Sequence, residues 1–132
     1  MKETAFNKSF VDKMKLKYPH MHGWKIHGHE MQESGIPDNL FCVNGTFVAI
    51  EFKIQRDGKV AVTKSFHQQC RQLGKIKDAG GVGLIVAYDE NRNKILIREK
   101  RIEKPKSYID WDFEFSSYDN AIDIVMLRIE GI

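Results

Sequence analysis

The stretch SGIPDNLFCVNGTFVAIEFK, residues 34–53, contains two strand-like apolar runs separated by Asn44-Gly45. Asn-Gly is the preferred pair for a two-residue type I′ turn, so the sequence predicts a tight β-hairpin. Counting outward from that turn, Val43 pairs with Thr46 and Asp38 falls opposite Glu51. The intervening residues Val48, Ile50, Phe52 and Ile54 occupy the other face, which we expect to be well buried.

Two carboxylates therefore face each other on one side of an apolar hairpin, and Lys53 follows on that same side. Like charges directly opposed across a sheet are destabilising. A hard divalent cation relieves the repulsion, and Mg²⁺ typically takes one or two carboxylates plus water and a substrate phosphate. The alternative is that acids at strand ends reach solvent and that Lys53 pairs with Glu51. A longer turn would also change the register and remove the pairing.

Apolar periodicity predicts two helices, over residues 3–17 and 65–79. The first carries Phe6, Phe10, Met14 and Tyr18 at four-residue steps, with Pro19 ending it. The second turns Phe66, Cys70, Leu73 and Ile76 inward and stops at Gly80-Gly81.

Short apolar runs predict the strands. A short strand is expected within GWKIHGH, two more in NLFCV and TFVAIEFKI, a central strand in VGLIVAY and a last strand in KILIR. In residues 105–132, IDWDFEF alternates, whereas AIDIVMLRI is compatible with either helix or strand. The order of helix, three strands, helix and two strands indicates an α/β fold in which the second helix crosses over to the central strand.

Length and composition fit one globular domain, residues 1–132. The chain is 42% hydrophobic and 30% charged, with a net charge of +3. That charge is uneven, because residues 92–106 and 1–17 are basic and residues 107–132 are acidic. Such asymmetry is compatible with a polyanionic partner, although ordinary solvated charge is the alternative.

Apolar runs of membrane-spanning length and a signal-peptide core are both absent from the sequence. Cys42 and Cys70 fall in expected core elements, and no CxxC pair is present. The simplest interpretation is a reduced, cytoplasmic protein with no membrane partner.

At this point the residues resemble a known signature. Pro37-Asp38 followed by Glu51-Phe52-Lys53 resembles the motif of the PD-(D/E)XK nuclease superfamily. The wider segment GTFVAIEFK to KSFHQQCRQLGKIKDAGGVGLIVAY resembles RecU-type Holliday junction resolvases and is similar to archaeal-type resolvases and VRR-NUC domains. The resemblance covers about residues 3–98, leaving 99–132 as a C-terminal extension. It implies a restriction-endonuclease-like fold, with a mixed central β-sheet flanked by helices.

The resemblance also implies roles for particular residues. Asp38 and Glu51 would bind Mg²⁺ or Mn²⁺ with help from the backbone carbonyl of Phe52. Lys53 would orient or deprotonate the attacking water and stabilise charge at the scissile phosphate. Glu3, which helical spacing places on the inward stripe, would match the acid of the first helix; the alternative is an acid that complements the helix dipole.

A glutamine on the second helix is also implied, and Gln68, Gln69 and Gln72 are candidates. Gln69 lies three residues after Phe66 and four before Leu73, so helical phase favours it, whereas Gln68 points away and is expected to form a capping box with Ser65. The chain departs from the RecU family, which places this glutamine nearer the position of Cys70 and carries a stalk insertion. A compact phage-type resolvase or a VRR-NUC-like nuclease fits the short chain.

The resemblance implies a Mg²⁺-dependent DNA endonuclease that hydrolyses phosphodiesters in branched DNA. We expect a homodimeric Holliday junction resolvase in recombination or repair, in the cytoplasm of its host if phage-encoded. A restriction-type enzyme and a non-catalytic nucleic-acid-binding module with the same fold are the alternatives. Basic residues that could grip DNA phosphates are Lys8, Lys15, Lys64, Arg71, Arg98, Lys100 and Arg101.

Histidines and tryptophans allow further interpretations. His20, His22, His27 and His29 form two H-x-H pairs, which could bind Zn²⁺ or Ni²⁺, face a substrate or lie on the surface. Trp24 and Trp111 are expected to be core or interface anchors rather than platforms for base stacking.

Overall fold

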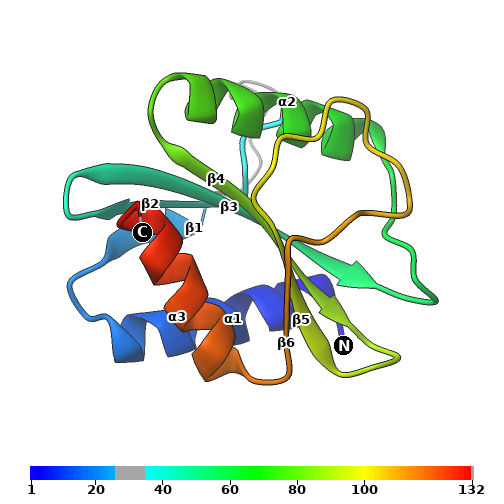
Figure 1. The fold of residues 1–132 in the computed structure, drawn as a ribbon, viewed down its shortest axis with the longest axis horizontal. Coiled ribbons are helices and arrows are strands. Elements are labelled where there is room, and N and C mark those ends of the chain that lie inside the picture. Colours follow the sequence, from blue (N-terminus) through cyan, green and yellow to red (C-terminus); the bar gives the residue numbers. More distant parts are fainter. Residues whose placement is uncertain (26–34, 132) are drawn as a thin grey trace.

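The computed structural model of the chain describes residues 1–25 and 35–131. These residues form three helices and six strands (Figure 1). In chain order the elements are α1 (Glu3–Lys17), β1 (His22–Lys25), β2 (Asn39–Val43), β3 (Thr46–Gln55), α2 (Lys64–Asp78), β4 (Val82–Asp89), β5 (Lys94–Arg98), β6 (Phe113–Phe115) and α3 (Tyr118–Ile129).

One mixed sheet, with its strands in the order β1-β2-β3-β4-β5-β6, runs through the molecule. β3 and β4 are parallel, and the other neighbouring strands are antiparallel. Parallel neighbours need a long crossover, which α2 supplies by crossing one face of the sheet (Figure 1). The expected mixed α/β architecture is therefore confirmed.

The hairpin has the register expected from its turn. Asn44 and Gly45 both have positive φ, 49° and 82°, as a type I′ turn requires. Val43 pairs with Thr46, and the ladder continues outward until Asn39 pairs with Ile50. Asp38 directly precedes the first paired residue of β2, and the next position on β3 is Glu51.

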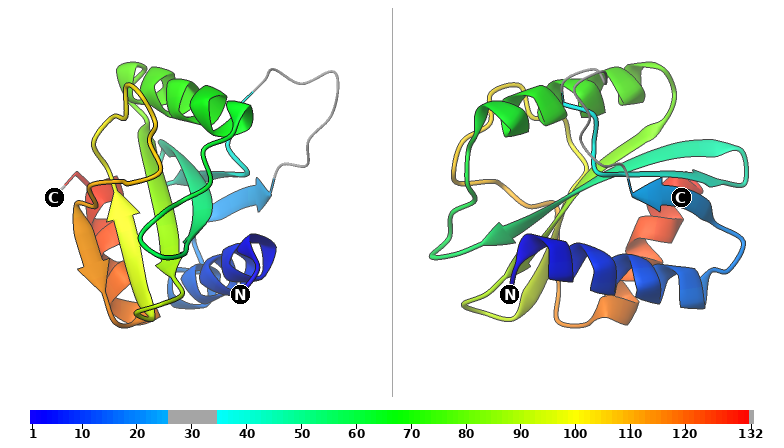
Figure 2. Two further views of the ribbon diagram at one scale, coloured as in Figure 1. Left: turned by 90° about the vertical axis from the view of Figure 1, so that its right-hand side faces the viewer. Right: turned by 180° about the vertical axis from the view of Figure 1, so that it is seen from behind.

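The sheet separates two apolar layers, with α1 and α3 on one face and α2 on the other (Figure 2). As expected, Val48, Ile50, Phe52 and Ile54 are buried in the layer beneath α1 and α3. There the ring of Phe52 packs between α1 side chains, its centroid 5.6 Å from that of Phe6. This packed layer fixes the position of β3. The side chains on the opposite face of β3 are therefore also held in position.

The second helix begins one residue earlier than expected. Thr63 is its N-cap, and the Thr63 hydroxyl accepts a hydrogen bond from the backbone N–H of Phe66 at 3.1 Å. The expected Ser65–Gln68 capping box is therefore wrong, because Ser65 already lies inside the first turn. The predicted stop is confirmed at Gly80, whose φ of +91° cannot continue a helix.

The last part of the chain completes both the sheet and the core. β6 pairs with β5, and the stretch left open between helix and strand is the helix α3, capped by Ser117. Ala121, Ile122 and Val125 of α3 are fully buried in the layer that contains Phe52. The hydrophobic core therefore includes residues of the segment 99–132, which lies beyond the stretch that carries the family resemblance.

Cys42 was expected in the core, and Trp24 in the core or at an interface; neither is buried in the core. Cys42 is exposed, whereas Cys70 is buried as predicted. Trp24 is 62% exposed on the edge strand β1, because no strand or helix of the described chain covers that edge. Trp111 is half-buried, and its Nε1–H donates to Gln55 at 2.9 Å. None of the described helices is long and apolar enough to cross a membrane.

Candidate metal centre

Three carboxyl groups from distant parts of the sequence converge near the middle of β3. Glu3 comes from the first turn of α1, Asp38 from the residue before β2 and Glu51 from β3. Each offers a carboxylate oxygen, and these oxygens all lie within 4.8 Å of one another. The structure thus brings together the three acids that the sequence analysis singled out, although their chemical roles remain a proposal.

Glu51 is the most constrained of the three, because its side chain is fully buried. Its Oε2 accepts a hydrogen bond from the backbone N–H of Asp38 at 3.3 Å, and its Oε1 has no hydrogen-bond partner among the described residues. Burial, reinforced by the negative charges of Asp38 and Glu3 and opposed by the positive charge of Lys53, raises the pKa of the Glu51 carboxyl to about 9. An ionised Glu51 therefore requires additional positive charge close by.

A hard divalent cation fits this arrangement. The donors are all carboxylate oxygens, the ligand type that Mg²⁺ and Mn²⁺ prefer over the softer sites of zinc or copper. A bound cation would also give the orphaned Oε1 of Glu51 a partner. The predicted help from the backbone carbonyl of Phe52 stays a prediction, since only the side-chain packing of Phe52 is described.

Lys53 lies two residues beyond Glu51 on the same strand face and is only 8% exposed. Its Nζ sits over the ring of Phe66 from α2, 4.6 Å from the ring centroid. This contact holds the ammonium group by attraction to the aromatic face. Among the described residues no ion pair joins Lys53 to Glu51, so the alternative in which the two pair directly is wrong.

Gln69 reaches the interior from α2. Its Oε1 is buried and lacks a hydrogen-bond partner within the described ranges, which agrees with the inward direction expected from helical phase. Gln68, expected to point away, is half-buried, and its backbone packs against Gly35. Gln69 is therefore the glutamine whose side chain has an unused buried polar atom.

Gly35 allows the chain before Asp38 to run against α2. Its φ is +81°, and a Cβ at this position would lie 2.5 Å from the Cβ of Gln68. Only glycine combines this backbone conformation with so close an approach. The contact positions the following segment, in which Pro37 is buried and Asp38 reaches Glu51.

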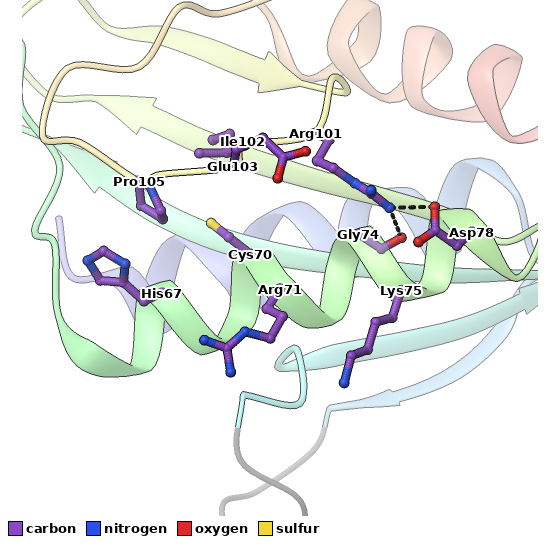
Figure 3. A pocket seen from close by; sticks show the side chains of 10 residues that line it. All are labelled: His67, Cys70, Arg71, Gly74, Lys75, Asp78, Arg101, Ile102, Glu103 and Pro105. Carbon is purple, nitrogen blue, oxygen red and sulfur yellow. Dashed lines mark hydrogen bonds and ion pairs between the residues drawn. The ribbon is translucent and has the colours of Figure 1, made fainter.

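The basic residues expected to contact DNA fall into two groups. Arg98 and Arg101 are used within the protein: Arg98 donates to the carbonyls of Lys100, Arg101 and Asp110, and Arg101 donates to Gly74 and Asp78. Figure 3 shows the hydrogen bonds of Arg101 to Gly74 and Asp78 of α2, and the side chains of Arg71 and Lys75 pointing away from Arg101. Lys8 forms a surface ion pair with Asp12 at 2.6 Å. The exposed side chains of Lys15, Lys64, Arg71 and Lys100 face solvent.

The structure describes only two of the four histidines of the predicted metal site. His20 and His22 are exposed, while His27 and His29 lie outside the described residues. Metal binding by these four histidines therefore stays a prediction.

Comparison with known proteins supports the fold assignment. No family model and no curated protein sequence matches the chain. Among solved structures, the chain is similar to Hjc, a Holliday junction resolvase from the archaeal hyperthermophile Archaeoglobus fulgidus. The TM-score is 0.53 and the sequence identity is 13%, over 89% of this chain and 98% of that chain. The protein thus has the restriction-endonuclease-like fold, a mixed sheet flanked by helices, as the sequence analysis expected.

Proposed function

We propose that this protein is a metal-dependent endonuclease of the PD-(D/E)XK type that hydrolyses phosphodiester bonds in branched DNA. The observation that carries this proposal is the fully buried Glu51, converging with Asp38 and Glu3 beside the sequestered amine of Lys53. The fold shared with a Holliday junction resolvase supports four-way junctions as the substrate to test first.

The burial of Glu51 favours catalysis over a purely binding role. A non-catalytic nucleic-acid-binding module needs exposed cations, but it gains nothing from a buried carboxyl group with one oxygen that lacks a hydrogen bond. A buried polar group that lacks a hydrogen bond costs about 1–3 kcal/mol of stability. A cation held jointly by Glu51 and Asp38 would compensate this loss of stability in the working enzyme.

In the proposed mechanism the acids hold the metal ion, and the side chains of Lys53 and Gln69 act on the phosphate and the attacking water. Asp38 and Glu51, with Glu3 and the Phe52 carbonyl, would hold Mg²⁺ or Mn²⁺, which polarises a phosphoryl oxygen and acidifies a bound water. Lys53 would place a positive charge near the scissile phosphate as negative charge develops there, and would orient the attacking water. The Gln69 amide, whose oxygen is unused, would position that water.

A branched DNA substrate also has consequences for the DNA-contacting surface, the oligomeric state and the location of the protein. Exposed Lys15, Lys64, Arg71 and Lys100 would contact flanking phosphates without reading sequence. Recognition of a symmetric junction needs two equivalent sites, so we infer a homodimer. A DNA substrate would place the protein in the cytoplasm, that of the host if a phage encodes it.

A cleavage assay in Mg²⁺ tests the proposal. Wild-type protein is incubated with a four-way junction, a flap, a single strand and a linear duplex, alongside Glu51→Ala and Asp38→Asn. We expect the wild type to cut branched DNA, and the two variants to lose cleavage by at least roughly a hundredfold while still binding DNA.

Each outcome separates the candidate functions. Absence of cleavage on all four substrates in Mg²⁺ or Mn²⁺ would refute the enzyme and favour the binding module. Equal cutting of linear duplex would refute junction preference and favour a restriction-type enzyme. Preference for the flap over the junction would favour a VRR-NUC-like structure-specific nuclease.

A further inference from the structure

Two grooves lie close to the metal centre. One has a volume of about 350 Å³ and is lined by Glu3 and Lys53, continuing past Lys59. The other, of about 450 Å³, lies between α1 and the β1–β2 edge of the sheet. Its lining includes Thr4 and Asn39, the immediate neighbours of Glu3 and Asp38. The first groove thus contains two residues of the centre, and the second contains the chain neighbours of two of its acids.

An exposed aromatic ring lines the groove along α1. Trp24 lines this groove with Lys8 and Lys15 and is 62% exposed, an unusual position for the largest apolar side chain. The ring of His22 contacts Trp24 edge-on, with centroids 4.7 Å apart, which restricts the indole. Asn39, which follows Asp38 in the chain and also lines this groove, has a buried Nδ2 without a partner among the described residues.

An exposed aromatic ring also lies beside the groove that contains Glu3 and Lys53. Tyr108 is 66% exposed, and the Nζ of Lys59 lies 5.5 Å from its ring centroid. Lys59 itself lines the groove that contains Glu3 and Lys53. Each groove is therefore lined by lysines and has an exposed aromatic ring in or beside its lining.

Resting on the proposed function, we propose that the DNA strand to be cut is unpaired where it crosses the metal centre, with one of its bases stacked on Trp24. Aromatic platforms alternating with cations are the means by which proteins hold single-stranded DNA, since every base has a face to stack and every nucleotide has a phosphate. Bases inside an uninterrupted duplex already stack on each other and cannot reach the indole. The substrate class is thus DNA with splayed or single-stranded nucleotides at the scissile phosphate, as at a branch point or a flap.

Charge complementarity favours this occupant over a second copy of the chain. Lys8 and Lys15 border the Trp24 groove, and Lys53 and Lys59 border the other. Lys8 is engaged by Asp12, but the remaining three form no ion pair within the part of the chain that is described. A groove bordered by these cations suits a phosphodiester backbone better than an identical basic groove.

Binding is tested without cleavage by using Glu51→Gln protein in EDTA. A labelled oligodeoxythymidylate reports affinity by fluorescence anisotropy, and intrinsic tryptophan fluorescence reports stacking. We expect the oligonucleotide to quench tryptophan emission, and Trp24→Phe to abolish that quenching while leaving the emission of Trp111. Trp24→Ala in the same background should weaken binding by about 5- to 150-fold, and Trp24→Phe by less.

Phe47→Ala serves as the matched control, because Phe47 is a 46% exposed aromatic residue that lines neither groove. We expect it to bind the oligonucleotide as tightly as the parent protein. Unchanged affinity in Trp24→Ala, or quenching that persists in Trp24→Phe, would overturn the proposal. So would a change of oligomeric state in Trp24→Ala by size-exclusion chromatography, since the ring would then be a subunit contact.

Cleavage separates the failure of this inference from the failure of the proposed function. With an intact Glu51, the wild type should cut a junction or flap with unpaired nucleotides at the branch faster than a continuous duplex, and Trp24→Ala should lose that advantage. Efficient cleavage without any effect of Trp24→Ala would refute the stacking site but leave the nuclease. Stacking on Trp24 without cleavage of any substrate would refute the nuclease and leave a single-strand-binding protein.

Discussion

Glu51 dominates the electrostatics of the centre at the scale of single residues. Its folded-state pKa of about 9 lies well above the ordinary 4.5. A group whose pKa is raised by folding contributes stability that is fully present below the unfolded pKa and is lost as pH rises through the folded pKa. In metal-free protein, stability should therefore fall between about pH 4.5 and pH 9 because of this residue.

Glu51→Gln should flatten that pH dependence, because the amide carries no charge to bury. We expect it to raise the free energy of unfolding at pH 8 by roughly a few kcal/mol, because the wild-type carboxyl must take up a proton to be buried at that pH and the amide need not. Urea denaturation in EDTA at pH 5, 7 and 9 measures the effect. Glu103→Gln, at an exposed acid, is the control. Parallel pH profiles for wild type and Glu51→Gln would contradict the prediction.

Lys53 should matter for cleavage and little for metal binding, since its amine contacts Phe66 rather than an acid. Lys53→Met should lower the single-turnover cleavage rate by roughly a hundredfold or more by removing charge stabilisation at the phosphate. Calorimetric Mn²⁺ affinity should be retained or improved, because a nearby positive charge is gone. Lys75→Met, on the outer side of α2, is the control, and equal rates for the two variants would argue against the role of Lys53.

At the scale of elements, the position of Asp38 depends on contact between the segment before β2 and helix α2. Gly35→Ala should move this segment, because the new methyl group would meet Gln68 and also strain a left-handed backbone. We expect a loss of about 1–3 kcal/mol in stability and a weaker metal site. Gly45→Ala is the control, since it shares a positive φ of 82° but meets nothing within 4 Å.

Thermal denaturation and Mn²⁺ titration compare the two glycine variants. If the prediction holds, both lose stability, but only Gly35→Ala loses metal affinity. Equal metal binding in the two variants would show that α2 does not position Asp38.

The helix α3 is a second element whose contribution can be measured. Ile122→Ala should destabilise the protein by about 2–5 kcal/mol, because the side chain is fully buried beneath the sheet. Leu127→Ala, on the same helix but 40% exposed, should have a much smaller effect. Urea denaturation of both variants is the test, and similar losses would mean that α3 does not complete the core in solution.

Element types were largely predictable because their determinants are local. Helix α1 has the predicted bounds, and the Asn44-Gly45 turn sets the hairpin register, since both residues tolerate positive φ. The segment containing α3 was ambiguous, because its run of apolar residues satisfies either a buried strand or a helix. Packing against Phe52 and α1 decided in favour of the helix, and no local signal expresses that contact.

At the scale of the whole molecule, a bound metal should link three separate parts of the chain. Mg²⁺ that binds only the folded state should stabilise it by about 2.7 kcal/mol at a hundredfold excess over Kd. Because free Glu51 is protonated at pH 7, binding should also release about one proton. Titration calorimetry in buffers of different ionisation enthalpy measures the proton, and Asp38→Asn should abolish both effects. Stabilisation equal in wild type and Asp38→Asn would place the metal elsewhere.

The sequence by itself determined the hairpin register, the helix phases and therefore the acids and the glutamine worth considering, because these depend on turn chemistry and periodicity within a few residues. Only the tertiary structure decided that the carboxyl group of Glu3 lies close to those of Asp38 and Glu51. It also decided that Arg98 and Arg101 donate to backbone carbonyls within the protein, and that Trp24 is exposed beside a groove. Those facts depend on which elements pack together across the sheet and which edge is left uncovered. Such contacts join residues far apart in the chain, so no local pattern records them.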